Sequence, residues 1–153
     1  MKLYMHPVSM TSRPVRLFIA ESGIKAEEQV VDLMTGEHVQ PAFTAINPSQ
    51  LVPVLEDGDL RLTESSAILK YLAEKTGSPA YPKDLKKRAR VNEVMDWLNT
   101  QFYRDWAYNL CYPQLFPHHK RPSKAVTKNS AKPKTTGSTM RAPMMRTASS
   151  LLR

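Results

Sequence analysis

The sequence contains a single cysteine, Cys111, among its 153 residues. An internal disulfide is therefore excluded, and this cysteine usage is typical of a protein in a reducing compartment. No run of the sequence approaches the roughly 18 apolar residues that a membrane-spanning helix requires. The first residues also lack the apolar segment of a secretory signal. These absences predict a cytoplasmic protein with no membrane partner.

Acidic residues are missing from the C-terminal part of the chain. Residues 1–119 hold 13 Lys and Arg and 14 Asp and Glu, whereas residues 120–153 hold 9 basic residues and no acidic residue. Low hydrophobicity with high charge predicts disorder, so we expect a disordered basic tail over residues 123–153. This tail could bind nucleic acid only nonspecifically, through phosphates, because it lacks interleaved aromatic residues.

Residues with the spacing of a metal site are also missing. His118 and His119 are adjacent, but no Cys or carboxylate partner lies nearby, which favours a solvated turn over a metal centre. The sequence therefore predicts no metal. Its length suits one domain or slightly more, and a hydrophobic content of 41% is sufficient for a core.

The order of the predicted elements is that of a small α/β domain with helices on both faces of a mixed sheet. Ser12 is the expected N-cap of the first helix, with Pro14 in its first turn, and the turn Asp57-Gly58-Asp59 predicts a hairpin. The expected elements are strand Leu3–Met5, helix Ser12–Gly23, strand Gln29–Val31, helix Gln40–Ile46, strands Leu51–Leu55 and Leu60–Leu62, and helix Ser65–Lys75.

Pro53 interrupts the apolar run Leu51–Leu55, where it removes a donor from the strand. Spacing alone favours a trans Val52–Pro53 bond, since only about one X–Pro bond in twenty is cis in folded proteins. A cis bond would instead present the backbone N–H and C=O of Val52 to a ligand.

The second part of the chain begins with a linker, Gly77–Pro82. From Asp84 an apolar stripe predicts one long helix that ends near Pro113; the stripe consists of Val91, Met95, Leu98, Phe102 and Trp106. Tyr103, Trp106 and Tyr108 could line a ligand pocket, although core packing is favoured for each of them.

The segment from Asn47 to Leu72 resembles the N-terminal domain of the glutathione S-transferases. The matching motifs are Asn47-Pro48, Val52-Pro53-Val54-Leu55, Glu64-Ser65 and the helix Ala67–Leu72, and the resemblance extends from Lys2 to about Pro122. It implies a thioredoxin-like fold, β-α-β-α-β-β-α, in which Pro53 is cis. The implied domains are a glutathione-binding domain (1–77), a linker (78–84), a partial all-α domain (85–122) and the tail (123–153).

The loop before the first helix offers three hydroxyl groups, and spacing does not distinguish Ser9 from Thr11 or Ser12. The run Ser9–Arg13 resembles the serine-type loop of theta-like members, in which the first Ser, four residues before the Arg, bonds the glutathione sulfur. The resemblance therefore implies that Ser9 is catalytic. Thioredoxin-like redox enzymes carry Cys-x-x-Cys at this place, and because Ser9 and Ser12 stand there, dithiol redox chemistry is excluded.

The resemblance also implies the residues that bind glutathione. Glu64 would pair with the ammonium of its γ-glutamyl end, and the Ser65 hydroxyl and N–H would hold the adjacent carboxylate at a helix N-terminus. Val52, before Pro53, would supply backbone hydrogen bonds to the cysteinyl part.

At the glycyl end of glutathione, His38 resembles the theta-like histidine that approaches the carboxylate. The family often has Lys or Gln immediately before the Val-Pro pair, but this chain has Leu51. Because Leu cannot contact the carboxylate, we expect weaker binding unless Gln50 or His38 compensates.

Together these features predict a theta-like glutathione S-transferase that uses glutathione as co-substrate for conjugation to small electrophiles. The family normally forms homodimers. Because the helical domain is incomplete in this chain, the sequence is interpreted as a truncated or frame-altered member. Two alternatives stay open: a catalytically impaired glutathione-binding remnant, and a basic-tailed interaction module with nonspecific nucleic-acid binding.

Overall fold

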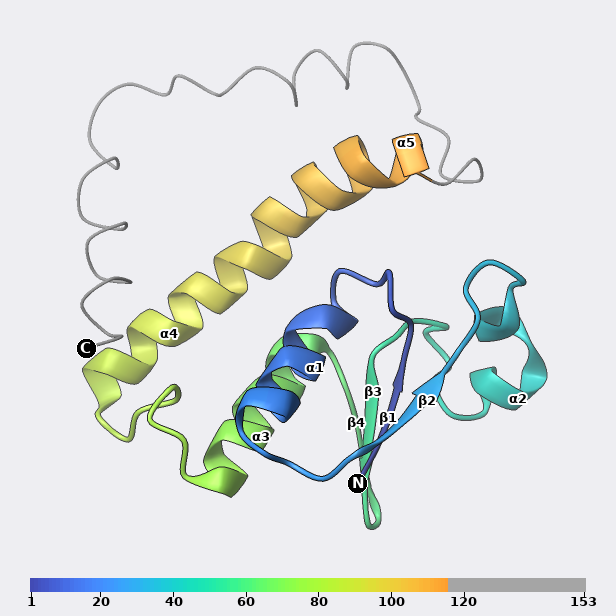
Figure 1. Cartoon of the computed structure of the whole chain (residues 1–153). Helices are drawn as coiled ribbons and strands as arrows, with labels where there is room; N and C mark the ends of the chain where they lie inside the picture. Colours follow the sequence, from blue (N-terminus) through green and yellow to red (C-terminus); the bar gives the residue numbers. More distant parts are fainter. Residues whose placement is uncertain (116–153) are drawn as a thin grey trace, which may run out of the picture. The chain divides into compact units, whose positions relative to one another are not determined.

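The computed structural model describes residues 1–115, so the predicted tail, the His118–His119 pair and residues 116–122 lie outside the described part. Figure 1 shows the elements in chain order. They are β1 (Lys2–Met5), α1 (Ser12–Glu21), β2 (Glu27–Val30), η1 (Glu37–Val39), α2 (Pro41–Thr44), β3 (Val54–Asp57), β4 (Leu60–Thr63), α3 (Ser65–Thr76), α4 (Leu85–Trp97), η2 (Leu98–Cys111) and α5 (Tyr112–Leu115). The expected order β-α-β-α-β-β-α is confirmed, with the 3-10 turn η1 added before α2.

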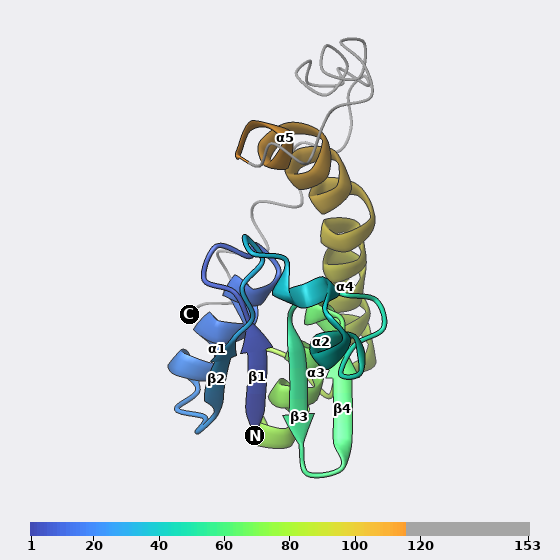
Figure 2. The same ribbon diagram turned by 90° about the vertical axis from the view of Figure 1, so that its right-hand side faces the viewer.

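The four strands form one mixed sheet in the order β2-β1-β3-β4. β1 and β2 are parallel and are joined by the crossover helix α1, whereas β3 is antiparallel to both β1 and β4. Helices α1 and α3 cover one face of the sheet, and α2 lies on the other (Figures 1 and 2). This is the thioredoxin-like arrangement that the sequence predicts.

Alternating side chains of the strands divide the core between the two faces, as the period of a strand requires. Towards α1 and α3 the buried residues are Leu3, Met5, Val15, Ile19, Leu55, Ile68 and Leu72. Towards α2 they are Val31, Phe43, Val52 and Val54. The sheet is therefore fixed from both sides.

Most element boundaries differ from the sequence prediction by one or two residues, and the larger differences concern β2, β3 and the N-cap of α1. β2 occupies Glu27–Val30 rather than Gln29–Val31. β3 begins at Val54 rather than Leu51, because Pro53 has no N–H to donate to a neighbouring strand. Ser12 was predicted as the N-cap of α1, but it is the first helical residue, and its hydroxyl has no partner in the described part of the chain. The Val52–Pro53 bond is cis, as the family resemblance implies.

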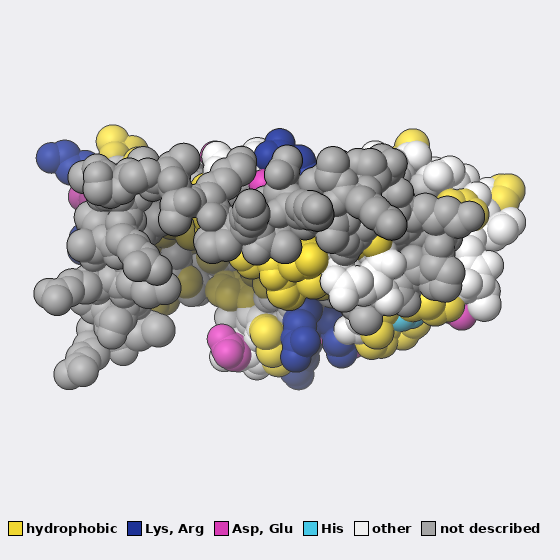
Figure 3. Space-filling model, turned by 90° about the horizontal axis from the view of Figure 1, so that it is seen from above, with side chains coloured by type: hydrophobic (Ala, Val, Ile, Leu, Met, Phe, Trp, Pro, Cys, Tyr) yellow, Lys and Arg dark blue, Asp and Glu magenta, His cyan; other side chains and the backbone are white. Residues whose placement is uncertain are grey.

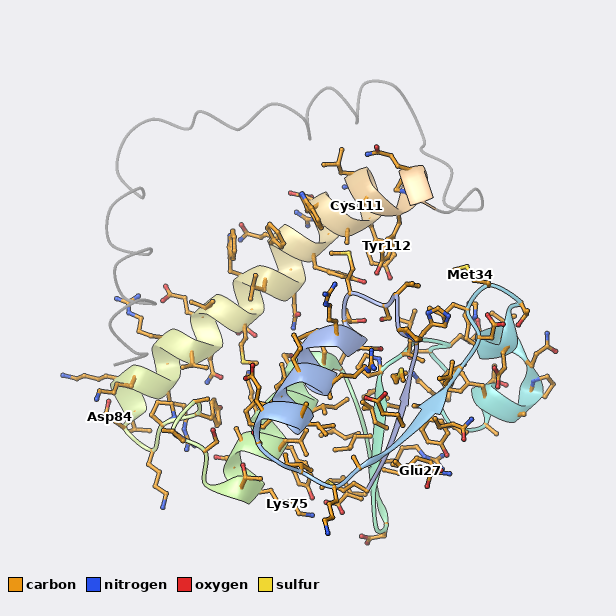
Figure 4. The ribbon with its side chains drawn as sticks, in the orientation of Figure 1. Glu27, Met34, Lys75, Asp84, Cys111 and Tyr112 are labelled. Carbon is orange, nitrogen blue, oxygen red and sulfur yellow. The ribbon has the colours of Figure 1, made fainter. Side chains whose placement is uncertain are left out.

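The first helix after α3 is α4, and its N-terminus is capped by a side chain. Asp84, labelled in Figure 4, accepts a hydrogen bond from the Lys87 N–H at 2.9 Å and caps α4. The side-chain amide of Asn99 in η2 donates to the hydroxyl of Ser66 in α3 at 2.9 Å.

The predicted long helix is present, and its second part, η2, has π-helical geometry. The chain divides into two compact units between Arg104 and Asp105. The domain boundaries predicted from the sequence (1–77, 78–84 and 85–122) stay a prediction. Within residues 1–115, no helix is long and apolar enough to cross a membrane.

One side chain fastens the β3–β4 hairpin to the end of α3. The Asp57 carboxylate accepts hydrogen bonds from the Lys75 ammonium and, at 2.6 Å, from the Tyr71 hydroxyl; Lys75 is labelled in Figure 4. These two donors, Lys75 first, hold the pKa of Asp57 below its usual value. The ionised form of Asp57 is therefore the one that stabilises the fold.

We expect Asp57→Asn to destabilise the protein at pH 7 but not in acid. A lowered folded-state pKa contributes stability above the unfolded-state pKa of about 3.9, and this stability is lost as the pH falls through the folded-state pKa. The difference in urea midpoint between wild type and variant should therefore shrink from pH 7 towards pH 3. Asp59→Asn, exposed at the tip of the same hairpin, is the control and should leave the midpoint unchanged. A difference that is equal at every pH would contradict this role for the carboxylate.

Candidate functional site

The topology brings all the candidate residues to one end of the sheet. The parallel strands β1 and β2 both end there, the antiparallel β3 begins there, and β4 ends there, with Val54 paired to Thr63. The loop 6–11, the Val52–Pro53 pair and the Glu64–Ser65 pair therefore gather at this end, which we call the site edge. His38 follows β2 by eight residues and approaches from the same end.

A chain of hydrogen bonds joins the loop before α1 to the segment before β3. The Thr11 hydroxyl donates to the Val52 carbonyl at 3.0 Å, and the Ser9 and Thr11 hydroxyl oxygens lie 3.1 Å apart. The Ser9 oxygen also accepts from the Ser12 N–H at 3.2 Å. Ser9 is buried. Its oxygen therefore gives the first N–H of α1 a partner, although the N-cap residue of the helix is Thr11 and not Ser12 as the sequence predicts.

The direction of these bonds follows from the number of protons. A hydroxyl has one proton to donate, and a carbonyl oxygen can only accept. The proton of Thr11 is engaged with Val52, so the proton between Ser9 and Thr11 belongs to Ser9. In this structure, the bonds therefore run from Ser9 to Thr11 and from Thr11 to Val52.

Asn47 shapes the turn that leads into Val52. Its side-chain amide donates to the Leu51 carbonyl at 2.8 Å and its side-chain oxygen accepts from the Ser49 N–H at 3.0 Å. Asn47 is 4% exposed, so water does not substitute for these partners. Gln50 in this turn has φ +60°, a conformation that is uncommon without glycine. Asn47-Pro48 is one of the motifs that carry the family resemblance, but the bond from Asn47 to Leu51 is visible only in the folded structure.

Glu64 and Ser65 stand where β4 passes into α3. Glu64 has φ +67°, and Ser65 is the first residue of the twelve-residue helix α3. A non-glycine residue in this region costs about 1–3 kcal/mol and persists only where the surroundings impose it. The conformation turns the chain sharply, so that the positive end of α3 meets the site edge.

The loop that carries His38 is closed by its own polar groups. The Asp32 carboxylate accepts from the N–H groups of Met34 (Figure 4) and Thr35, which lower its pKa. The Glu37 carboxylate accepts from the Asp32 N–H at 2.7 Å. The Nδ1 atom of His38 is buried and has no partner within residues 1–115.

Some of the predicted site residues are connected by hydrogen bonds, and others are only placed at the same edge of the sheet. Hydrogen bonds connect Ser9 to Val52 through Thr11, whereas topology alone brings Glu64, Ser65 and His38 to the same edge. Leu51 is exposed there. Seen from above, an apolar area of the described surface lies beside a group of Lys and Arg side chains (Figure 3). Within the described residues, no group of three His, Cys, Asp or Glu side chains could hold a metal ion.

Comparison with known proteins identifies similar sequences and structures. The family model "Glutathione S-transferase, N-terminal domain" matches residues 1–74. Human glutathione S-transferase theta-1 is 41% identical over 119 residues, which cover 76% of this chain and 50% of that protein. The chain therefore spans about half the length of the curated relatives it matches.

Solved structures agree with this similarity. Human glutathione transferase theta-2, in complex with glutathione and an unknown ligand, superposes with a TM-score of 0.70 at 36% identity, over 84% of this chain and 54% of that one. A delta-class glutathione transferase from Nilaparvata lugens gives a TM-score of 0.72 at 34% identity, over 84% of this chain and 60% of that one.

We expect Asn47→Ala to lower the free energy of unfolding by about 1–2 kcal/mol, because it removes the hydrogen bonds of the buried Asn47 side chain to the Leu51 carbonyl and from the Ser49 N–H. Urea unfolding followed by circular dichroism measures this loss. Asn47→Asp is the matched variant: it keeps the acceptor for Ser49 and removes only the donor to Leu51. If Asn47→Ala is as stable as wild type, the side chain does not hold this turn.

Proposed function

Since residues 1–74 belong to the glutathione S-transferase N-terminal domain family, we propose that this chain binds glutathione at the site edge and activates its thiol for attack on small electrophiles. The observation that supports this most directly is the convergence of Ser9, Val52 and the start of α3 on one end of the sheet. Each of these groups matches one part of the tripeptide.

Ser9 is the proposed catalytic residue, as the donor to the glutathione sulfur. A thiol of pKa about 8.5 is only a few per cent ionised at pH 7, and lowering the pKa by two units takes about 2.7 kcal/mol. One hydrogen bond to a charged group contributes roughly 1.5–3 kcal/mol, and a helix N-terminus adds about 0.3–1 kcal/mol. One serine at the start of α1 is therefore sufficient, and no general base is needed.

The remaining contacts would orient the tripeptide. The Glu64 carboxylate pairs with the α-ammonium of the γ-glutamyl end, and the Ser65 hydroxyl and N–H bind its carboxylate at the start of α3. The backbone of Val52, before the cis Pro53, forms hydrogen bonds with the cysteinyl residue. This assignment gives a function to the unusual backbone of Glu64.

At the glycyl end, the proposed partner is His38. The imidazole of His38 is partly exposed and can bond to a carboxylate through a ring nitrogen, which the apolar side chain of Leu51 cannot do. Binding at this end therefore depends on His38 or Gln50, and we expect the affinity for glutathione to be lower than with a lysine at position 51.

The proposal extends to the partners and the location of the protein. We propose a small electrophile as the second substrate, a homodimer as in the family, and a cytoplasmic location. The chain spans about half of its curated relatives, and the proposed contacts with glutathione all come from residues 9–65.

Glutathione binding tests the proposed ligand contacts. We expect Glu64→Gln to weaken glutathione binding about tenfold or more, because it removes a charged partner of the ammonium. Isothermal titration calorimetry of the full chain measures the affinity. Glu21→Gln, exposed at the end of α1, is the matched control. Equal affinities for wild type and Glu64→Gln would remove Glu64 from the site.

Thiol activation tests the role of Ser9. We expect Ser9→Ala to bind glutathione but to raise the pKa of the bound thiol towards about 8.5, and to lower turnover of a small alkyl halide at pH 7 by about 10–100-fold. The ultraviolet absorbance of the thiolate gives the pKa. Ser78→Ala, in the linker, removes a half-buried hydroxyl that accepts from the Ala80 N–H, and it should change neither value. Binding without turnover in the wild type would show a glutathione-binding protein that is not an enzyme.

A further inference from the structure

Thr11 occupies the centre of the hydrogen-bond chain at the site edge. In this structure its proton bonds to the Val52 carbonyl, while its oxygen receives the proton of Ser9. Both ends of this chain have other tasks in the proposed function, since Ser9 must donate to the glutathione sulfur and Val52 must accept a backbone N–H of glutathione. The observed hydrogen bonds therefore engage the proton that Ser9 needs for activation.

We propose that Thr11 is a positioning residue whose hydroxyl reverses its direction when glutathione binds, and this inference rests on the proposed function. The cysteinyl N–H of glutathione takes the Val52 carbonyl and frees the proton of Thr11. Thr11 then donates to the Ser9 oxygen, and Ser9 turns its own proton to the sulfur. The bonds now run from Thr11 to Ser9 and from Ser9 to the thiolate.

The step balances without a further reactant. The thiol of glutathione releases its proton to water, and the sulfur keeps the electron pair as a thiolate. The O–H bonds of Ser9 and Thr11 rotate but do not break. A hydroxyl that accepts a hydrogen bond becomes a better donor, by roughly 10–30% per bond. Thr11 thus strengthens the bond from Ser9 to the sulfur only after the reversal.

The test compares Thr11→Val, which has nearly the same shape but no hydroxyl, with Thr11→Ser, which keeps the hydroxyl. We expect Thr11→Val to raise the pKa of bound glutathione by about half a pH unit, because the support of Ser9 is lost. Thr11→Ser should restore the wild-type pKa. Thr76→Val, which removes a hydroxyl bonded to the Leu72 carbonyl in α3, is the matched control and should leave it unchanged.

A second ligand separates this role from a merely structural one. S-Methylglutathione has no ionisable thiol, so its affinity does not depend on the proton of Ser9. Thr11→Val should bind it within about twofold of wild type, since the Val52 carbonyl is free to accept. If Thr11 only anchored the loop, its loss would weaken both ligands together and leave the thiol pKa unchanged, which would overturn the proposal.

The ligand-free protein provides an independent measurement. The carbonyl carbon resonance of Val52 should shift in Thr11→Val, because its hydrogen-bond donor is removed, and an unshifted resonance would also overturn the inference. If the wild type does not bind glutathione, the proposed function and this inference fail together. If glutathione binds with the same thiol pKa in wild type and Thr11→Val, only the inference about Thr11 fails.

Discussion

The antiparallel pairing of β3 with both of its neighbours is the constraint on which the site depends. Val54 lies opposite Tyr4 on one side and opposite Thr63 on the other. Because the chain enters β3 where β1 and β4 end, this register places Val52 between the loop of Ser9 and the start of α3. A slip of one residue would turn Val54 and Leu55 to the wrong faces of the sheet. The two buried clusters therefore protect the geometry of the site as well as the stability of the fold.

Several features of the site edge lower the stability of the fold, and the rest of the domain must offset this loss of free energy. Glu64 and Gln50 have positive φ values, and the buried Ser12 hydroxyl and His38 Nδ1 atoms lack partners within residues 1–115. Unpaired buried polar groups cost about 1–3 kcal/mol each, and strained residues cost a similar amount. Such features cluster where a ligand makes use of them, which agrees with the proposed position of glutathione. The hydrogen bonds of Asn47, Asp32 and Thr11 hold the loops in place around these groups.

The proposed work of the protein divides along the chain. All the residues assigned to glutathione lie between Ser9 and Ser65, inside the segment that matches the N-terminal domain family. The hydroxyl of Ser66, the residue after Ser65, accepts from Asn99, so the long helix after the linker is attached to the start of α3. In the proposed function, the recognition of glutathione is therefore built from one domain.

The sequence by itself determined the order of the elements, because hydrophobic periodicity, the Asp57-Gly58 turn and the start of α3 at Ser65 are local signals. It also carried the family motifs at Val52-Pro53 and Glu64-Ser65. Only the tertiary structure decided how the three hydroxyls before α1 differ. Thr11 bonds to a carbonyl 41 residues away, Ser9 accepts from the Ser12 N–H, and the buried Ser12 hydroxyl has no partner within residues 1–115. Spacing cannot reveal this, because the direction of a hydroxyl proton depends on acceptors that only folding brings within reach.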